Sequence, residues 1–148
     1  VIRRATLADL DQIVELEHAG FTLDLFTRRQ FRYYLTRGRG VVLVDSTRGK
    51  IRGMAVAMWR RNGRSGRIYD IVVRLALQGR GLGSRLLRAA EAEARRQGCE
   101  RMVLEVRRDN AAAIGFYEEH GYRRFDVLPG YYEDGTDALR YAKGLIGP

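Results

Sequence analysis

Residues 78–85 read QGRGLGSR and lead directly into residues 86–97, LLRAAEAEARRQ. The loop places glycine at positions 79, 81 and 83, and apolar residues then recur at helical spacing at Leu82, Leu86, Ala90 and Ala94. Glycine lets a backbone approach a ligand closely, and the free N–H groups and dipole at the start of a helix favour a phosphate. The stretch is therefore typical of an anion site, although glycine loops also form plain tight turns.

Two known phosphate-binding patterns can be compared with this loop. A P-loop requires a lysine directly after its last glycine, whereas the chain has only two lysines, at positions 50 and 143. A dinucleotide-binding fingerprint fits better at Gly79 and Gly81, with Glu105 placed where a ribose-binding acid is expected. Its third position, however, is Ser84, and RLALQ separates the loop from the strand-like IYDIVV. The P-loop is excluded and the dinucleotide pattern remains a minor alternative.

The chain before the loop shows strand and helix patterns in turn. A short opening strand covers residues 1–4, and two pairs with capping-box spacing, Thr6 with Asp9 and Thr27 with Gln30, each predict the start of a helix. Gly38 and Gly40 are expected to end the second of these helices. Three strands follow at residues 41–46, 51–59 and 68–73, and the turn-rich TRGK joins the first two as a hairpin.

After the glycine loop and its helix, RMVLEV predicts a strand, and residues 110–120 predict a helix that ends at Gly121. Two last strands complete the order βααβββαβαββ. We expect an α/β (α+β) fold with a mixed, largely antiparallel sheet flanked by helices. The length of 148 residues and a hydrophobic content of 45% suit a single domain covering residues 1–148.

Composition narrows the class of protein. No apolar run approaches the roughly 18–20 residues that a bilayer crossing needs, so we expect a cytoplasmic protein with no membrane partner. One cysteine and two histidines offer no zinc-ligand spacing, which predicts no metal. The formal charge of +9 comes almost entirely from scattered arginines. Without a basic tract or aromatic binding signature it does not predict direct nucleic-acid binding, and it suits an anionic small molecule equally well.

Two stretches carry a resemblance to a known family. IVVRLALQGRGLGSRLL resembles motif A of the GNAT acetyltransferases, whose Gln/Arg-x-x-Gly-x-Gly/Ala pattern is met by Gln78, Gly81 and Gly83. LEVRRDNAAAIGFYEEHGYRRF is similar to a segment of the RimI-type protein N-terminal acetyltransferases within that superfamily. The likeness extends over essentially the whole chain, including the tail GYYEDGTDALRY. Leu75, Tyr122 and Tyr141 depart from the usual proline, phenylalanine and methionine.

The resemblance implies a GNAT fold and acetyl-coenzyme A as the acetyl donor. Its pyrophosphate would lie on the amides of the loop, and its pantetheine arm along the strand before it. The cofactor-binding residues expected on this basis are Ile71, Val73, Gln78, Gly79, Arg80, Gly81, Leu82, Gly83, Ser84, Asn110 and Tyr117. Asn110 suits a helix N-cap as well as a pantetheine contact. Arg80 and Arg85 are either phosphate contacts or solvated surface charges.

Direct transfer to an amine requires a base for the amine and an acid for the departing thiolate. Alternation along RMVLEVR places Met102, Leu104 and Val106 on one face and Val103, Glu105 and Arg107 on the other. Glu105 in an otherwise apolar strand centre indicates either a salt bridge, for which Arg107 is a candidate partner, or the general base that the resemblance implies, acting directly or through a water. Tyr117 is either a core aromatic or the acid that the resemblance implies.

Other polar residues have simpler interpretations. His120 closes a helix, where the dipole favours a partly cationic imidazole, so capping is favoured over catalysis. Cys99 fits a small core residue, which disfavours an acetyl-cysteine mechanism. Asp70 is kept as a second candidate base.

The acceptor is predicted mainly from the resemblance. Tyr131 and Tyr132 resemble residues that close over the first residues of a peptide, and Glu133 and Asp134 suit attraction of its cationic amine. We therefore expect a protein or peptide N-terminus as acceptor, with a lysine or small-molecule amine as the alternative. A non-catalytic coenzyme A-binding module is the rival from another class. The sequence is compatible with a monomer or a homodimer.

Overall fold

The computed structural model describes residues 1–20, 25–37, 39–60 and 63–146. The strands are β1 (Ile2–Arg4), β2 (Gly40–Thr47), β3 (Lys50–Trp59), β4 (Ser65–Val73), β5 (Arg101–Arg107), β6 (Arg123–Leu128) and β7 (Ala138–Gly144). The helices are α1 (Leu10–Gly20), α2 (Arg28–Thr36), α3 (Leu82–Arg96) and α4 (Ala111–Glu119), and single 3₁₀ turns precede α1 and α3. The predicted order βααβββαβαββ is confirmed.

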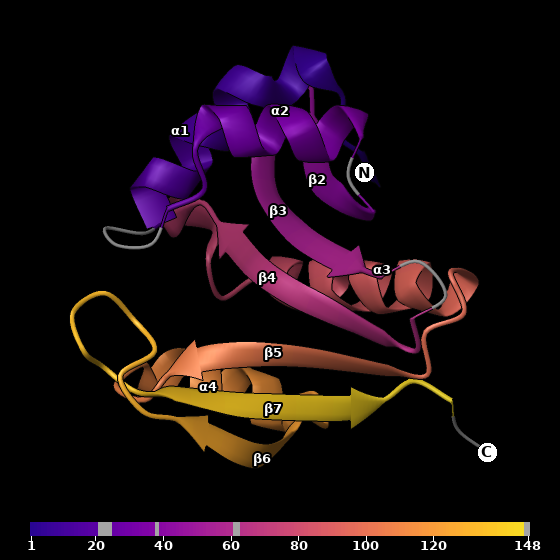
Figure 1. Ribbon diagram of the computed structural model, residues 1–148. Coiled ribbons are helices and arrows are strands. Elements are labelled where there is room, and N and C mark those ends of the chain that lie inside the picture. Colours follow the sequence, from indigo (N-terminus) through magenta and orange to yellow (C-terminus); the bar gives the residue numbers. More distant parts are fainter. Residues whose placement is uncertain (21–24, 38, 61–62, 147–148) are drawn as a thin grey trace.

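All seven strands form one sheet in the order β1-β2-β3-β4-β5-β7-β6. The β4–β5 pair is parallel and the other pairs are antiparallel. The predicted mixed, largely antiparallel sheet is therefore confirmed. Figure 1 shows that β4 and β5 run together at one end of the sheet and separate toward the other.

Helices cover the sheet unevenly. Helices α1 and α2 lie over β2, β3 and β4 (Figure 1), where Ile13, Leu16 and Phe31 join a buried cluster with the strands. Helix α3 packs on the opposite face of the same strands through Leu82, Leu86 and Ala90. Helix α4 covers β5, β6 and β7 on the α3 side. Strands β2 and β3 are thus buried on both faces, which explains their nearly continuous apolar sequences.

Local sequence signals account for most element boundaries. Gln30 N donates to Thr27 Oγ1, and Thr27 N donates to Gln30 Oε1, which forms the predicted capping box of α2. Asp9 likewise accepts from Thr6 N at 2.8 Å, although a 3₁₀ turn precedes α1 there. Gly38, expected to end α2, lies outside the described residues. Within the described residues, no helix is long and apolar enough to cross a membrane.

The separation of β4 from β5 has a local cause. Parallel pairing runs from Ser65 opposite Arg101 to Ile68 opposite Leu104 and ends there. At the next residue, Tyr69, β4 carries a bulge, because its register against β3 shifts between Val56 and Ala57. A bulge bends its strand and increases the local twist. The end of β4 therefore turns away from β5 and leaves one strand edge without a strand partner.

Candidate active site

A cavity of about 750 Å³ opens where β4 leaves β5. Its walls come from the end of β4, the glycine loop, the start of α3 and the first turns of α4. Nine of the eleven residues expected to bind the cofactor line it: Ile71, Val73, Gln78, Gly79, Gly81, Gly83, Ser84, Asn110 and Tyr117. The structure therefore brings the end of β4, the glycine loop and the start of α4 to one cavity.

Arg80 and Leu82 do not line this cavity. The Leu82 side chain is buried in the core beneath α3, so only its backbone is available to a ligand. Arg80 is exposed on the outside of the loop. The placement of these two side chains is consistent with a loop that presents main-chain N–H donors to the cavity and directs its side chains away from it.

The glycine loop has the conformation that its sequence requires. Gly79 and Gly81 have φ of +80° and +78°, in the left-handed region that glycine adopts without strain. A Cβ built at either position would meet no atom of the described residues within 4 Å, so each glycine borders open space. The first amides of α3 have no acceptor within the helix, and Arg85 N is the first to bond back, to Gly81 O. The loop and helix start therefore present N–H donors at the cavity.

The next wall is an exposed strand edge. Val73 pairs with Gly53 of β3 on one side, but on its other side β4 pairs with no described strand after Ile68. Ile71 and Val73 both lie on this stretch and line the cavity. Such an edge offers amide and carbonyl groups that an extended ligand can pair with.

Helix α4 contributes its N-terminus to the cavity. Asn110 is its N-cap, with Oδ1 accepting from Ala113 N at 3.1 Å. His120 stands at the other end, where its Nδ1 contacts the Phe116 carbonyl at 2.7 Å and its Nε2 contacts Ser84 Oγ at 2.9 Å. Because a carbonyl only accepts, Nδ1 carries a proton. His120 thus fastens α4 to the start of α3, in agreement with its structural interpretation.

Tyr117 lies at the inner end of the cavity, with 9% of its surface exposed. Its ring makes edge-on contacts with the rings of Phe116 and Tyr122, at interplanar angles of 76° and 72°. Burial raises the pKa of Tyr117 well above its usual range, and the charges of Asp70 and Tyr132 add to the effect. The side chain is therefore both a core aromatic and a cavity residue whose hydroxyl keeps its proton at neutral pH.

Glu105 lies on the opposite face of β5, as alternation predicts, and 7% of its side chain is exposed. It is the residue directly after the last β4–β5 pair. Arg67 of β4 binds its Oε1, and Arg140 Nε of β7 lies 3.4 Å from its Oε2. The suggested partner Arg107 is wrong, because Arg107 binds Asp109 and Asp134 instead. Arg140 is the direct cross-strand neighbour of Glu105, and such neighbours approach more closely than residues two apart on one strand.

The sequence did not predict Arg67 as a site residue. Arg67 links two residues that the sequence did predict, Glu105 and Tyr131. Its Nη2 binds Glu105 and also lies 2.9 Å from the Tyr131 hydroxyl. Tyr132 packs against Tyr131, and the Arg107 guanidinium lies over its ring at 4.9 Å. The only sequence signal for Arg67 is its charge, which stands directly before the apolar Ile68 and near the polar Asp70. The strand that carries these residues lies next to β5. The loop before β7 thus reaches the Glu105 side of the sheet.

Two acidic residues have partners that change their expected roles. Asp134 binds Arg107 at 2.6 Å, and this hydrogen bond holds its pKa well below the usual range. Asp70 is half-buried beside Glu17 of α1, and burial together with the hydrogen bond from Glu17 raises its pKa to about 9. Asp70 is therefore protonated at neutral pH and lacks the free carboxylate that a base requires. Asp134 remains ionised but is already paired.

Comparison with known proteins gives a consistent result. Residues 8–122 match the profile of the acetyltransferase (GNAT) family. An uncharacterized N-acetyltransferase of Methanocaldococcus jannaschii is 31% identical over 97% of this chain and 90% of its own. The N-terminal acetyltransferase A complex catalytic subunit NAA10 of Arabidopsis thaliana is 32% identical over 99% and 78%. Among solved structures, the ribosomal-protein-S18-alanine N-acetyltransferase of Escherichia coli has a TM-score of 0.87 and 25% identity, covering 100% of this chain and 95% of that one.

Proposed function

This chain belongs to the acetyltransferase (GNAT) family and is an N-acetyltransferase, and from this premise we propose that it acetylates the N-terminal α-amine of a protein by direct transfer. The observation that carries the proposal is the placement of Tyr117 and Glu105 on the two faces of the sheet where β4 and β5 part. We also propose that residues 1–148 act as a single domain.

GNAT acetyltransferases use acetyl-coenzyme A, and the cavity fits this donor. The amides between Gly79 and Ser84 are suited to the pyrophosphate, because left-handed glycines and a helix start direct N–H groups at one place. The free edge at Ile71 and Val73 is suited to the pantetheine arm, and Asn110 lies opposite that edge. Bound there, the molecule supplies an acetyl thioester.

The residues on either face then have distinct tasks. Glu105 accepts a proton from the attacking amine, directly or through a water, while Arg67 and Arg140 fix the carboxylate in place. Tyr117 donates its proton to the departing sulfur, and its raised pKa ensures that the proton is present. An amide on β4 facing the thioester carbonyl would stabilise the charge that develops there.

An α-amine suits this arrangement better than a lysine side chain. Its pKa is about 8 against about 10.4 for lysine, so freeing the lysine amine at neutral pH costs roughly 3 kcal/mol more. Tyr131 is bound by the same arginine, Arg67, as Glu105, and it packs against Tyr132, so both rings are suited to contacting the first residues of a peptide. The similarity to NAA10 and to the ribosomal-protein-S18-alanine acetyltransferase favours the same class of acceptor.

The test offers acetyl-coenzyme A with peptides that have a free N-terminus and no lysine, the same peptides with a blocked N-terminus and one lysine, and small polyamines. Mass spectrometry reads acetylation, and a thiol reagent reads release of coenzyme A. We expect transfer only to the free N-termini. Equal reaction of the blocked, lysine-containing peptides would contradict the proposed acceptor, and binding of acetyl-coenzyme A without release of thiol to any amine would contradict catalysis.

A further inference from the structure

A second hollow of about 900 Å³ lies on the face of the sheet away from α3 and α4. It runs from the end of α2 across the start of β4 to β5 and β7, and we call it the arginine groove. Seven of its described lining residues are arginines, and none of its described lining residues is acidic. Five lie at its outer end, namely Arg37, Arg39, Arg60, Arg64 and Arg101, and Arg67 and Arg140 lie at its inner end.

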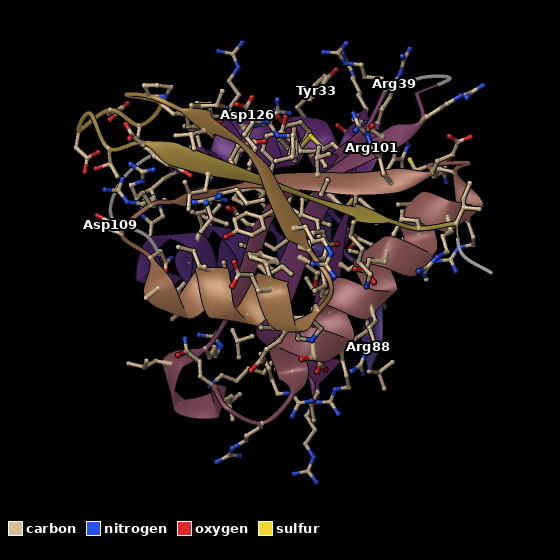
Figure 2. All side chains as sticks on the ribbon, turned by 90° about the horizontal axis from the view of Figure 1, so that it is seen from below. Tyr33, Arg39, Arg88, Arg101, Asp109 and Asp126 are labelled. Carbon is tan, nitrogen blue, oxygen red and sulfur yellow. The ribbon has the colours of Figure 1, made fainter. Side chains whose placement is uncertain are left out.

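The outer arginines carry charge that the fold leaves almost unneutralised. Arg37, Arg39 and Arg60 are exposed and form no ion pair with any other described residue. Arg64 approaches Glu100 only at 3.7 Å, and Arg101 binds the neutral Ser65 hydroxyl. Figure 2 shows Arg39 and Arg101 near Tyr33 on this side of the sheet, whereas Arg88 projects from α3 on the other side. A concave surface with one sign of charge concentrates ligands of the opposite sign.

At the inner end the arginine charge is partly neutralised. Arg67 and Arg140 line the groove there and both bind Glu105, which is not among the described lining residues. The inner end of the groove therefore adjoins the residue proposed to receive the acceptor amine. A peptide whose amine lies at Glu105 would place its following residues along the groove, where anionic groups meet the outer arginines.

We propose that the arginine groove binds acidic side chains of the acceptor polypeptide, a few residues after its N-terminus. This inference rests on the proposed function, because the N-terminal amine is what places the peptide at Glu105. Arginine forks match carboxylates in two-point hydrogen bonds, and the exposed Tyr33 and Tyr69 rings offer apolar contact beside them. A nucleic acid fits less well, since it has no N-terminal amine for the site that the groove adjoins.

The experiment uses two peptides with the same first three residues, one with glutamate and one with glutamine at positions four to eight, each with a fluorophore at its C-terminus. Initial rates give kcat and KM, and fluorescence anisotropy gives Kd. At low salt we expect the glutamate peptide to have a KM and Kd about tenfold lower, with little change in kcat, and the difference to shrink as salt is added.

Variants locate the effect. In Arg39→Gln/Arg101→Gln the ratio between the two peptides should fall to about twofold, because both side chains lie in the groove. Arg88→Gln removes a similar exposed charge on the other side of the sheet (Figure 2) and should leave the ratio unchanged. Equal KM for both peptides, or an equal loss of the ratio in Arg88→Gln, would overturn the proposal.

Two further outcomes separate the possible explanations. If no peptide is acetylated, the proposed function fails, yet tighter binding of the glutamate peptide that depends on Arg39 and Arg101 still supports the groove. A single-stranded oligonucleotide that binds more tightly than the glutamate peptide, and loses this binding in the same double variant, would assign the groove to nucleic acid and overturn the inference.

Discussion

Glu105 and Tyr117 are held by contrasting surroundings, although each is close to fully buried. Glu105 is surrounded by charge, with guanidinium groups on both of its oxygens. Tyr117 is surrounded by other rings and by the apolar side chains of β5 and β7. A group bound by cations is suited to existing as an anion, and a phenol in an apolar site is suited to keeping its proton. The two environments therefore match a proton acceptor and a proton donor.

The role of Tyr117 can be separated from its packing by removing only its hydroxyl. Tyr117→Phe keeps the ring and its contacts with Phe116 and Tyr122, so the free energy of unfolding and the Kd for acetyl-coenzyme A should change little. If the hydroxyl donates the proton, kcat should fall about 100-fold. Steady-state kinetics and calorimetry measure both quantities on the same protein.

Tyr122→Phe is the matched control for this change. The Tyr122 hydroxyl is also buried and donates to Glu91 Oε2 at 2.8 Å, and neither residue is among those lining the cavity. Its removal should lower the free energy of unfolding by about 1–3 kcal/mol and leave kcat nearly unchanged. A Tyr117→Phe variant with full kcat would make Tyr117 a core residue only.

At the scale of elements, the loop before α3 and the hairpin between β2 and β3 each contain a glycine with nearly the same left-handed φ. Gly81 has φ of +78° and Gly49 has φ of +77°, and a Cβ at either would meet no protein atom within 4 Å. Alanine at each should therefore cost a similar amount, about 1–2 kcal/mol of folding free energy. The open space beside Gly81 belongs to the cavity, whereas that beside Gly49 faces solvent.

Gly81→Ala should therefore weaken acetyl-coenzyme A binding at least tenfold, because a methyl group intrudes where the pyrophosphate is proposed to approach. Gly49→Ala should show the same small loss of stability with unchanged affinity. Isothermal calorimetry with thermal unfolding on both variants tests this pair. An unaltered Kd in Gly81→Ala would reduce the loop to a tight turn.

Elements also show what the sequence alone predicts well. The capping pair at Thr27 and Gln30, the glycine loop and the strand around Glu105 all depend on residues a few positions apart, and each was predictable. Arg67 was not, because its contact with Glu105 spans 38 residues and depends on the β4–β5 register. The separation of β4 from β5 depends on a bulge at Tyr69. No glycine or proline stands at this position to signal the bulge in the sequence.

At the scale of the whole molecule, Glu17 and Asp70 join α1 to the centre of the sheet. Glu17 Oε2 accepts from Phe26 N at 2.8 Å, while its Oε1 and Asp70 Oδ2 are buried atoms with no other hydrogen-bond partner among the described residues. Two carboxyl groups that interact in this way cannot both ionise without a nearby cation. One proton shared between them satisfies both oxygens, and it explains why burial and Glu17 raise the pKa of Asp70.

This shared proton makes the stability of the fold depend on pH. An unfolded aspartate releases its proton near pH 4, whereas Asp70 in the folded chain keeps it to about pH 9. Between these values the folded state binds more protons than the unfolded state, so the free energy of unfolding falls as pH rises. The contribution of the pair is fully present below about pH 4 and is lost as the pH passes through the folded pKa.

Asp70→Asn should remove most of this slope, because the amide gives Glu17 a permanent donor in place of the proton. Urea unfolding between pH 5 and pH 9 measures this slope. The free energy of unfolding of the parent protein should fall by up to about 1.4 kcal/mol per pH unit, and that of the variant by much less. Asp9→Asn is the control, since the hydrogen bond from Arg3 lowers the pKa of Asp9 and its titration lies below this range. The Asp9→Asn control should have a lower free energy of unfolding at every pH, but that free energy should change with pH as it does in the parent protein. An Asp70→Asn variant that keeps the parent's slope would show that the two carboxyls do not share a proton.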